Sequence, residues 1–178
     1  MRRFSLALVA VALLGLVAVN AVGKTEAQDE PTQHPIVGSW RIALIVTGAM
    51  DQEGALSSFT SDGSVVSSVK PVSPAPAGSP FGQIFASLAH GSWTSDGTTS
   101  AAFTIVRLQT DEQGNYLGTV SVSAVGDMGT DGESVSGPFT YDVADPTGAV
   151  IASGTGTFEG SRIAVEPMAT PTEGTPVT

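Results

Sequence analysis

The feature that most constrains the fold of this chain is a series of five short turn motifs in its middle part. Asp and Gly occur together in each motif, and both accept the backbone conformations of tight turns at little cost. The motifs are SDG at 61–63 and at 95–97, DEQGN at 111–115, TDG at 130–132 and DPTG at 145–148. Turns at this spacing favour short strands joined into hairpins.

Between the turns lie eight runs with the character of strands. In one of them, Phe139, Tyr141 and Val143 alternate with the polar residues Thr140 and Asp142. A period of two with one polar side is typical of antiparallel strands that face water on one side. The eight runs cover residues 38–48, 54–60, 64–70, 88–95, 99–110, 115–126, 133–144 and 149–166.

Consecutive strands with short connections form a meander, and a meander of eight strands tends to close because closure removes both unpaired edges. We therefore predict an all-β fold, an eight-stranded antiparallel up-and-down barrel over residues 36–166. A two-sheet sandwich is the alternative, but sandwiches usually need a long crossover connection. An eight-stranded barrel has room inside for side chains or for one small ligand.

The one long connection, at 71–88, begins with several prolines, which exclude a central strand. Four large apolar residues follow at i, i+3, i+4 and i+7, which predicts a short helix over residues 80–89. They are Phe81, Ile84, Phe85 and Leu88. We expect them to form either a lid across one end of the barrel or a plug that caps its core.

Residues 1–27 have the order of a secretory signal peptide. Arg2 and Arg3 precede an apolar run at 6–19, and small residues follow at two possible cleavage points, after Ala21 and after Ala27. We expect export, to the outside of the cell or an extracytoplasmic compartment. An uncleaved membrane anchor is the alternative, because the uncharged stretch is just long enough to span a bilayer.

The regions that flank the predicted barrel have little to bury. Residues 28–35 are expected to be a linker, and residues 167–178, which are rich in Thr and Pro, a disordered tail. With the signal removed, we expect no membrane association. The oligomeric state stays open.

Charge and composition exclude several functions. The formal net charge is −10, which opposes binding to nucleic acid. The chain has no cysteine and only two histidines, so we expect neither a metal site nor a disulfide. No nucleotide-binding loop and no Gly-x-Ser-x-Gly motif occur, and we expect no cofactor.

The sequence Gly38-Ser39-Trp40 begins the first predicted strand, and Arg162 lies in the last. A Gly-x-Trp of this kind, eight strands in a meander and a late basic residue resemble the lipocalin–calycin superfamily. The resemblance implies that Arg162 lies over the Trp40 indole in a cation–π contact. The missing disulfide, and the missing helix after the last strand, make the chain more similar to small bacterial exported barrels than to the larger lipocalins.

The tripeptide recurs as Gly91-Ser92-Trp93. Either the chain contains an internal duplication, or two strand starts need the same aromatic plug. True repeats show longer self-similarity than this, which favours the second explanation. We expect Trp93, like Gly38, Trp40 and Arg162, to have a structural role.

The predicted barrel interior defines a candidate ligand site. Its expected wall is Phe103, Ile105, Arg107, Tyr116, Val120, Phe139 and Tyr141. If its strand face points inward, Arg107 is a buried cation that needs an acidic partner or an anionic ligand group. Otherwise it lies near the strand end and reaches out to water. The expected ligand is a small apolar or amphipathic molecule, held without a covalent bond.

Two further functions stay open. The segment GTGTFEG at 154–160 resembles a strand of allene oxide cyclases and dirigent proteins, which implies an isomerase or cyclase. Glycine-rich strands also occur wherever barrels bend sharply, so this resemblance assigns no catalytic residue. The third possibility is a filled barrel that serves as a structural or interaction module of the cell envelope.

Overall fold

The computed structural model describes residues 33–49 and 52–166 of the chain. In these residues the fold is all-β, with ten strands and no helix, and thus with no helix that could cross a membrane. The signal peptide expected at 1–27 and the tail expected at 167–178 lie outside the described residues, as does most of the expected linker.

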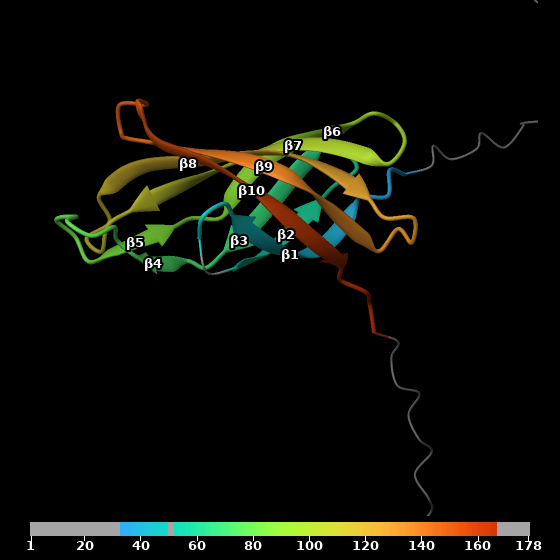
Figure 1. Ribbon diagram of the computed structural model, residues 1–178, viewed down its shortest axis with the longest axis horizontal. Coiled ribbons are helices and arrows are strands. Elements are labelled where there is room, and N and C mark those ends of the chain that lie inside the picture. Colours follow the sequence, from blue (N-terminus) through green and yellow to red (C-terminus); the bar gives the residue numbers. More distant parts are fainter. Residues whose placement is uncertain (1–32, 50–51, 167–178) are drawn as a thin grey trace, which may run out of the picture. The chain divides into compact units, whose positions relative to one another are not determined.

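Eight of the ten strands close into an antiparallel barrel (Figure 1). Around the barrel the order is β1-β2-β3-β6-β7-β8-β9-β10, and the pairing of β10 with β1 completes the ring. The strands are β1 (Gly38–Val46), β2 (Glu53–Phe59), β3 (Ser64–Val69), β6 (Ala89–Ser95), β7 (Ser100–Thr110), β8 (Tyr116–Met128), β9 (Ser134–Ala144) and β10 (Val150–Arg162).

The predicted fold class is confirmed at this level. Each barrel strand lies within a few residues of the run predicted for it, and the largest difference is that β10 ends at Arg162 rather than at 166. Strands joined by the Asp–Gly turns are neighbours in the barrel, as a meander requires. The turns are local signals, which is why the sequence indicates them so well.

The helix predicted over 80–89 is wrong. The long connection instead forms a hairpin of β4 (Val72–Pro74) and β5 (Gln83–Ala86), which lies outside the ring of eight strands. The reason is the length of β7, whose pairing with β6 reaches only as far as Val106. Strand β5 pairs with the rest of that edge, at Gln109 and Thr110, and so satisfies backbone groups that a short helix would leave unpaired.

The core follows the alternation of the strands. Trp40 and Ile42 of β1 and Phe158 of β10 point inward, while Arg41 between them is exposed. Buried residues from seven of the eight barrel strands make one hydrophobic cluster, and the partly buried Trp93 of β6 packs against it. In Figure 1 the described N-terminal residues lie at the right-hand end of the barrel, and the β4–β5 hairpin lies at the left-hand end.

Candidate ligand-binding cavity

The barrel encloses a cavity of about 250 Å³ lined by the inward faces of its strands. Apolar side chains supply most of the lining. They include Ile42, Leu44, Phe59, Phe103, Ile105, Val120, Val122, Phe139, Tyr141 and Phe158. The cavity reaches the strand ends at Val46, Glu53, Val69, Gln109 and Val143, and we call this the rim end. The other end, which we call the closed end, is sealed by residues 34–37 and Trp40.

Aromatic rings form the deep part of the cavity. Phe103 lies edge to face with Phe59 at 5.3 Å between ring centroids and with Phe158 at 5.7 Å. Phe59 also meets Trp93 at 6.3 Å. Such T-shaped pairs hold the rings in fixed positions, which gives a ligand a rigid apolar floor.

Two glycines of β10 make room for the rings of the wall. Gly154 pairs with Tyr141 and Gly156 with Phe139 in the ladder between β10 and β9. A Cβ on Gly154 would lie 2.6 Å from the Tyr141 ring, and one on Gly156 would lie 2.5 Å from the Phe139 ring. Gly154 and Gly156 therefore have a packing role in this barrel, because each supports an aromatic ring.

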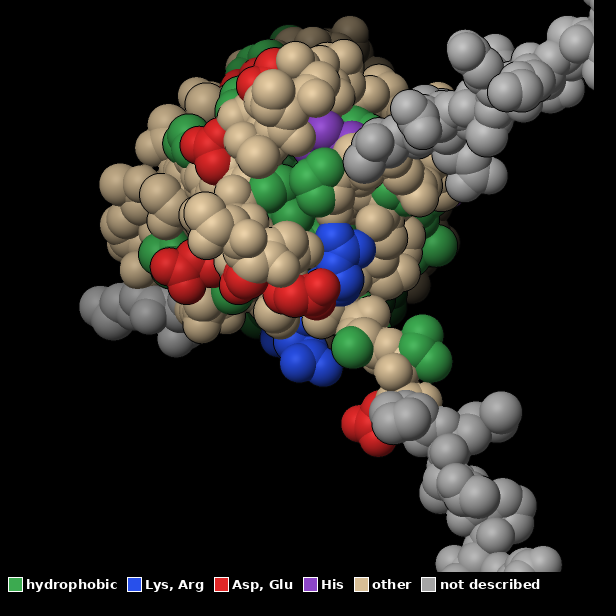
Figure 2. Space-filling model, turned by 90° about the vertical axis from the view of Figure 1, so that its right-hand side faces the viewer, with side chains coloured by type: hydrophobic (Ala, Val, Ile, Leu, Met, Phe, Trp, Pro, Cys, Tyr) green, Lys and Arg blue, Asp and Glu red, His purple; other side chains and the backbone are tan. Residues whose placement is uncertain are grey.

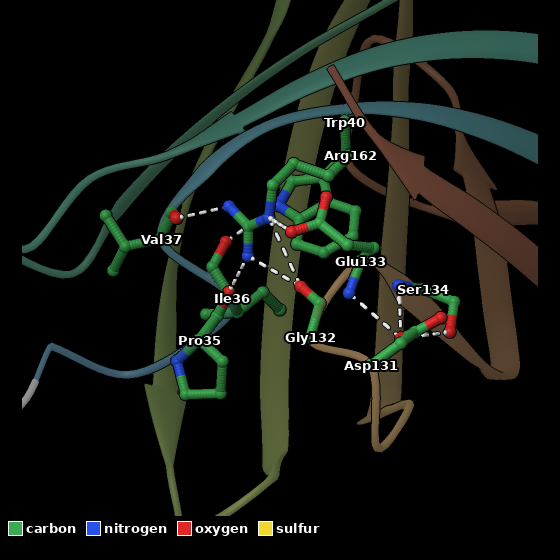
Figure 3. A network of polar contacts seen from close by, with 9 residues as sticks. All are labelled: Pro35, Ile36, Val37, Trp40, Asp131, Gly132, Glu133, Ser134 and Arg162. Atoms are coloured by element: carbon green, nitrogen blue, oxygen red, sulfur yellow. Dashed lines mark hydrogen bonds and ion pairs between the residues drawn. The ribbon is translucent and has the colours of Figure 1, made fainter. Parts of the chain in front are cut away.

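Trp40 closes the opposite end of the barrel from the rim (Figure 3). Its side chain is fully buried, and its indole N–H donates a hydrogen bond of 2.7 Å to the carbonyl of Ile36. Ile36 is 1% exposed and lines the cavity from below. The bond thus holds the N-terminal segment across the barrel end as a seal.

Arg162 fastens this seal from outside. Its Cζ lies 4.4 Å from the centroid of the Trp40 ring, the cation–π contact that the resemblance implied. The guanidinium donates hydrogen bonds to the carbonyls of Pro35, Val37 and Gly132, and its Nε is 3.6 Å from a Glu133 oxygen. Arg162 therefore links the last strand, the N-terminal segment and the β8–β9 turn (Figure 3).

Gly38 is needed for this arrangement. Its φ is +136°, and a Cβ there would lie 2.5 Å from Nη1 of Arg162. The second copy of the tripeptide has a different basis, because a Cβ on Gly91 would collide with the backbone of Thr104 on β7. Gly91 is also the third residue of β6 rather than its first. The two Gly-Ser-Trp copies therefore have the same sequence, but their glycines have different structural environments.

Trp93 is only partly buried, in contrast to Trp40. Its indole N–H donates to the carbonyl of Thr60 at 2.9 Å, and its ring lies 5.7 Å from that of His34. Figure 2 views this end of the barrel, where hydrophobic side chains lie beside histidine and acidic side chains gather to one side. Both tryptophans thus lie at the closed end of the barrel.

The β8–β9 turn that faces Arg162 is ordered by Asp131. The carboxylate accepts hydrogen bonds from the backbone N–H of Glu133 and from the N–H and hydroxyl of Ser134. These bonds, the one from Glu133 above all, lower the pKa of Asp131 below its usual value. The turns at Asp62, Asp96, Asp111 and Asp145 have the same design, and hydrogen bonds lower the pKa of each carboxyl there too.

Arg107 is the cation of the cavity. It lies on the inward face of β7 between Ile105 and Gln109, opposite Val120 of β8. Its Nε is buried and has no hydrogen-bond partner among the described residues. The one ion pair within 4.0 Å in the described part of the chain is that of Arg162, so no carboxylate there forms an ion pair with Arg107.

Other polar groups of the lining already have partners or lie across the barrel. The hydroxyls of Ser57 and Ser67 are buried and hydrogen-bonded to each other at 2.9 Å. The Ser87 hydroxyl donates to the carbonyl of Leu88 and accepts from the N–H of Leu108. Glu53 lines the cavity from β2, which β3 and β6 separate from β7.

Six of the seven predicted wall residues line the cavity: Phe103, Ile105, Arg107, Val120, Phe139 and Tyr141. Tyr116 does not, and it is 46% exposed. Thr110 pairs with Tyr116 while Gln109 pairs with Gly118, so Leu117 is an extra residue in the strand. This β-bulge reverses the alternation below Gly118 and turns Tyr116 outward.

The four residues expected to form a lid lie outside the cavity, unlike most of the predicted wall residues. None of Phe81, Ile84, Phe85 and Leu88 lines the cavity. Leu88 is 54% exposed, and Phe85 pairs with Thr110 at the edge of β7. The segment extends the sheet beside the rim end instead of forming a helix over it.

Some of the lining was absent from the prediction. Gln109 continues the alternation of Phe103, Ile105 and Arg107 and could have been found from it. Phe158 alternates with the glycines of β10 in the same way. Glu53 and the seal residue Ile36 carry no such signal, because each lies at a strand start or before it.

The described residues offer no arrangement for metal chemistry, since no group of three or more His, Asp or Glu side chains among them could hold an ion. Comparisons with protein-family models, with curated proteins and with solved structures gave no match. The function must therefore be argued from the cavity itself.

Proposed function

We propose that this protein binds one small apolar or amphipathic molecule, without a covalent bond, inside its barrel. The observation that carries the proposal is the cavity of about 250 Å³, apolar over most of its lining and floored by fixed aromatic rings. Burial of a ligand there removes apolar surface from water, at about 25 cal/mol per Å² of apolar surface.

The size of the cavity limits the ligand. The cavity volume of about 250 Å³ lies just below the range of about 300–1,000 Å³ that is usual for ligand pockets. The molecule is therefore smaller than the drug-sized ligands that protein pockets often enclose. The same cavity favours a binding role over a barrel packed full of its own side chains.

We also propose that binding takes place outside the cytoplasm. The support is the order of basic, apolar and small residues in 1–27, which is that of a secretory signal peptide. Labelling of the N-terminus of the protein recovered from its host would test this. A mature N-terminus at 22 or 28 supports export with cleavage, and an intact Met1 contradicts it.

Native mass spectrometry of the protein purified from its own host tests the binding function directly. We expect a mass excess that disappears when the same sample is denatured. A bare polypeptide mass, together with no uptake of apolar fluorescent probes, would contradict the proposal and favour a purely structural barrel.

A pair of variants on β8 tests whether binding uses the cavity. Val122 lines it, whereas Val125 is 48% exposed on the outer face. Val122→Phe fills the cavity and should abolish uptake of an apolar fluorescent probe, while Val125→Phe should leave uptake unchanged. Equal uptake by both variants would place any binding elsewhere on the molecule.

A further inference from the structure

Arg107 has chemistry that a purely apolar ligand does not need. Its Nε is buried in the cavity lining without a hydrogen-bond partner among the described residues. Arg107 is partly buried, and partial removal of a cation from water without an ion-pair partner costs free energy, as does a buried N–H without an acceptor. A methionine of similar length would fill the same space at lower cost.

No described residue accepts a hydrogen bond from the buried Nε of Arg107. Its neighbours on the inward face of β7 are Ile105 and the amide side chain of Gln109, and Val120 lies across from it on β8. The hydroxyl of Ser87, which lines the same region, already bonds to the β7 backbone. A bound ligand can supply the acceptor that the described residues do not give to Arg107.

We infer that the bound molecule is a monoanionic amphiphile, a medium-chain or aromatic carboxylate, whose charged group is held by Arg107. This inference rests on the proposed function and names its ligand class. The fork of the guanidinium matches the two oxygens of a carboxylate. Gln109, next along the strand toward the rim, supplies a further N–H donor on the same face.

The geometry also orients the ligand. Phe103 and Ile105 lie on the closed-end side of Arg107, with Phe59 and Phe158 packed against Phe103. The apolar part therefore lies on the aromatic floor, and the charged group lies nearer the rim. Glu53 repels an anion from the β2 wall, which favours the head group on the β7 side.

Three probes of equal chain length test the inference: octanoate, 1-octanol and octylammonium. We expect calorimetry at pH 7 to show octanoate binding about ten- to a hundredfold more tightly than octanol. Octylammonium should bind most weakly. In Arg107→Met, octanoate should fall to the affinity of octanol, while the affinity of octanol itself stays nearly unchanged.

Matched variants separate a local effect from a general one. Arg41→Met removes the same charge from the exposed outer face of β1 and should preserve the preference for octanoate. Arg107→Lys should keep part of that preference, because it retains the charge but not the fork. Glu53→Gln should raise the affinity for octanoate and lower that for octylammonium. Thermal melts of each variant establish that it is folded.

The outcomes distinguish the two proposals. If octanoate and octanol bind equally to the unmodified protein, the anion inference is overturned while the binding function stands. The same conclusion follows if Arg41→Met abolishes the preference as fully as Arg107→Met. If no probe binds and no apolar dye enters the barrel, the binding function itself is overturned, and the inference with it.

Discussion

Arg162 and Arg107 lie toward opposite ends of the same barrel, and their surroundings differ. Arg162 at the closed end donates to three backbone carbonyls, pairs with Glu133 and covers the ring of Trp40. Arg107 toward the rim end has a buried Nε without a described partner. The guanidinium of Arg162 makes four hydrogen bonds within the chain, whereas no described residue bonds to the buried Nε of Arg107.

The difference separates a structural role from a binding role. A cation that makes most of its hydrogen bonds within the chain stabilises the fold and has little capacity left for a ligand. A cation that lacks such bonds lowers stability, and sites of this kind are retained where binding needs them. The following predictions test whether the two ends divide stability and binding in this way.

The largest effect should come from Trp40→Ala. This side chain is fully buried and seals the closed end, so its loss leaves a cavity beside Ile36. We expect a loss of about 3–5 kcal/mol in the free energy of unfolding, measured in urea. Trp93→Ala is the comparison, and its partly buried ring should cost distinctly less. Equal losses would mean that the two Gly-Ser-Trp copies are equivalent after all.

Arg162→Met should have the next largest effect. The carbonyls of Pro35, Val37 and Gly132 lose a donor, and the indole loses its cation. We expect a loss of about 2–4 kcal/mol in the free energy of unfolding, less than for a fully buried ion pair because the side chain is 22% exposed. Arg41→Met, on the outer face, should change stability by less than about 0.5 kcal/mol.

Gly38→Ala should destabilise by a smaller amount, about 1–3 kcal/mol, because alanine is strained at φ +136° and its Cβ displaces the guanidinium. A double-mutant cycle sharpens the test. Since both changes disturb one contact, Gly38→Ala should cost less when Arg162 is already Met. Full additivity in urea unfolding would show that Gly38 acts through its backbone strain alone.

The barrel strands could be predicted because their signals are local. Asp62, Asp96 and Asp131 each accept a hydrogen bond from the backbone N–H two residues further on, so a few residues define each turn. Alternation then defines the faces between turns. The strand β5 could not be predicted in this way, because it forms to satisfy the edge of β7, which is distant in sequence.

In the candidate site, too, the features set by local sequence could be predicted, and those set by contacts distant in sequence could not. Phe103, Ile105 and Arg107 follow from an alternation that no irregularity interrupts. The prediction for Tyr116 is wrong because an alternating pattern cannot reveal the β-bulge at Leu117. The bulge shifts the strand by one residue, so Tyr116 faces outward. Whether Arg107 has a partner depends on what the other seven strands bring opposite it, and the seal at Ile36 depends on a hydrogen bond from Trp40.

A smaller effect is expected from Asp131→Asn in the turn that faces Arg162. The folded pKa of Asp131 lies below 3.8, so its ionised form contributes stability above that pH and loses it as pH falls through the folded pKa. The stability gap between the unmodified protein and the variant should therefore narrow below about pH 3.8. Asp142→Asn on the outer face of β9 is the control. A gap that does not change with pH would contradict the role of the carboxylate.

The smallest effect on stability, with the opposite sign, should come from Arg107→Met. Replacing a partnerless cation in an apolar lining by an apolar side chain of similar length removes a desolvation cost and keeps the packing. We expect the free energy of unfolding, measured without ligand, to stay within about 1 kcal/mol of the unmodified value or to rise. A loss as large as that of Arg162→Met would mean that Arg107 also holds the fold together. The proposed difference between the two arginines would then be wrong, because both would stabilise the fold and Arg107 would not have a role in binding alone.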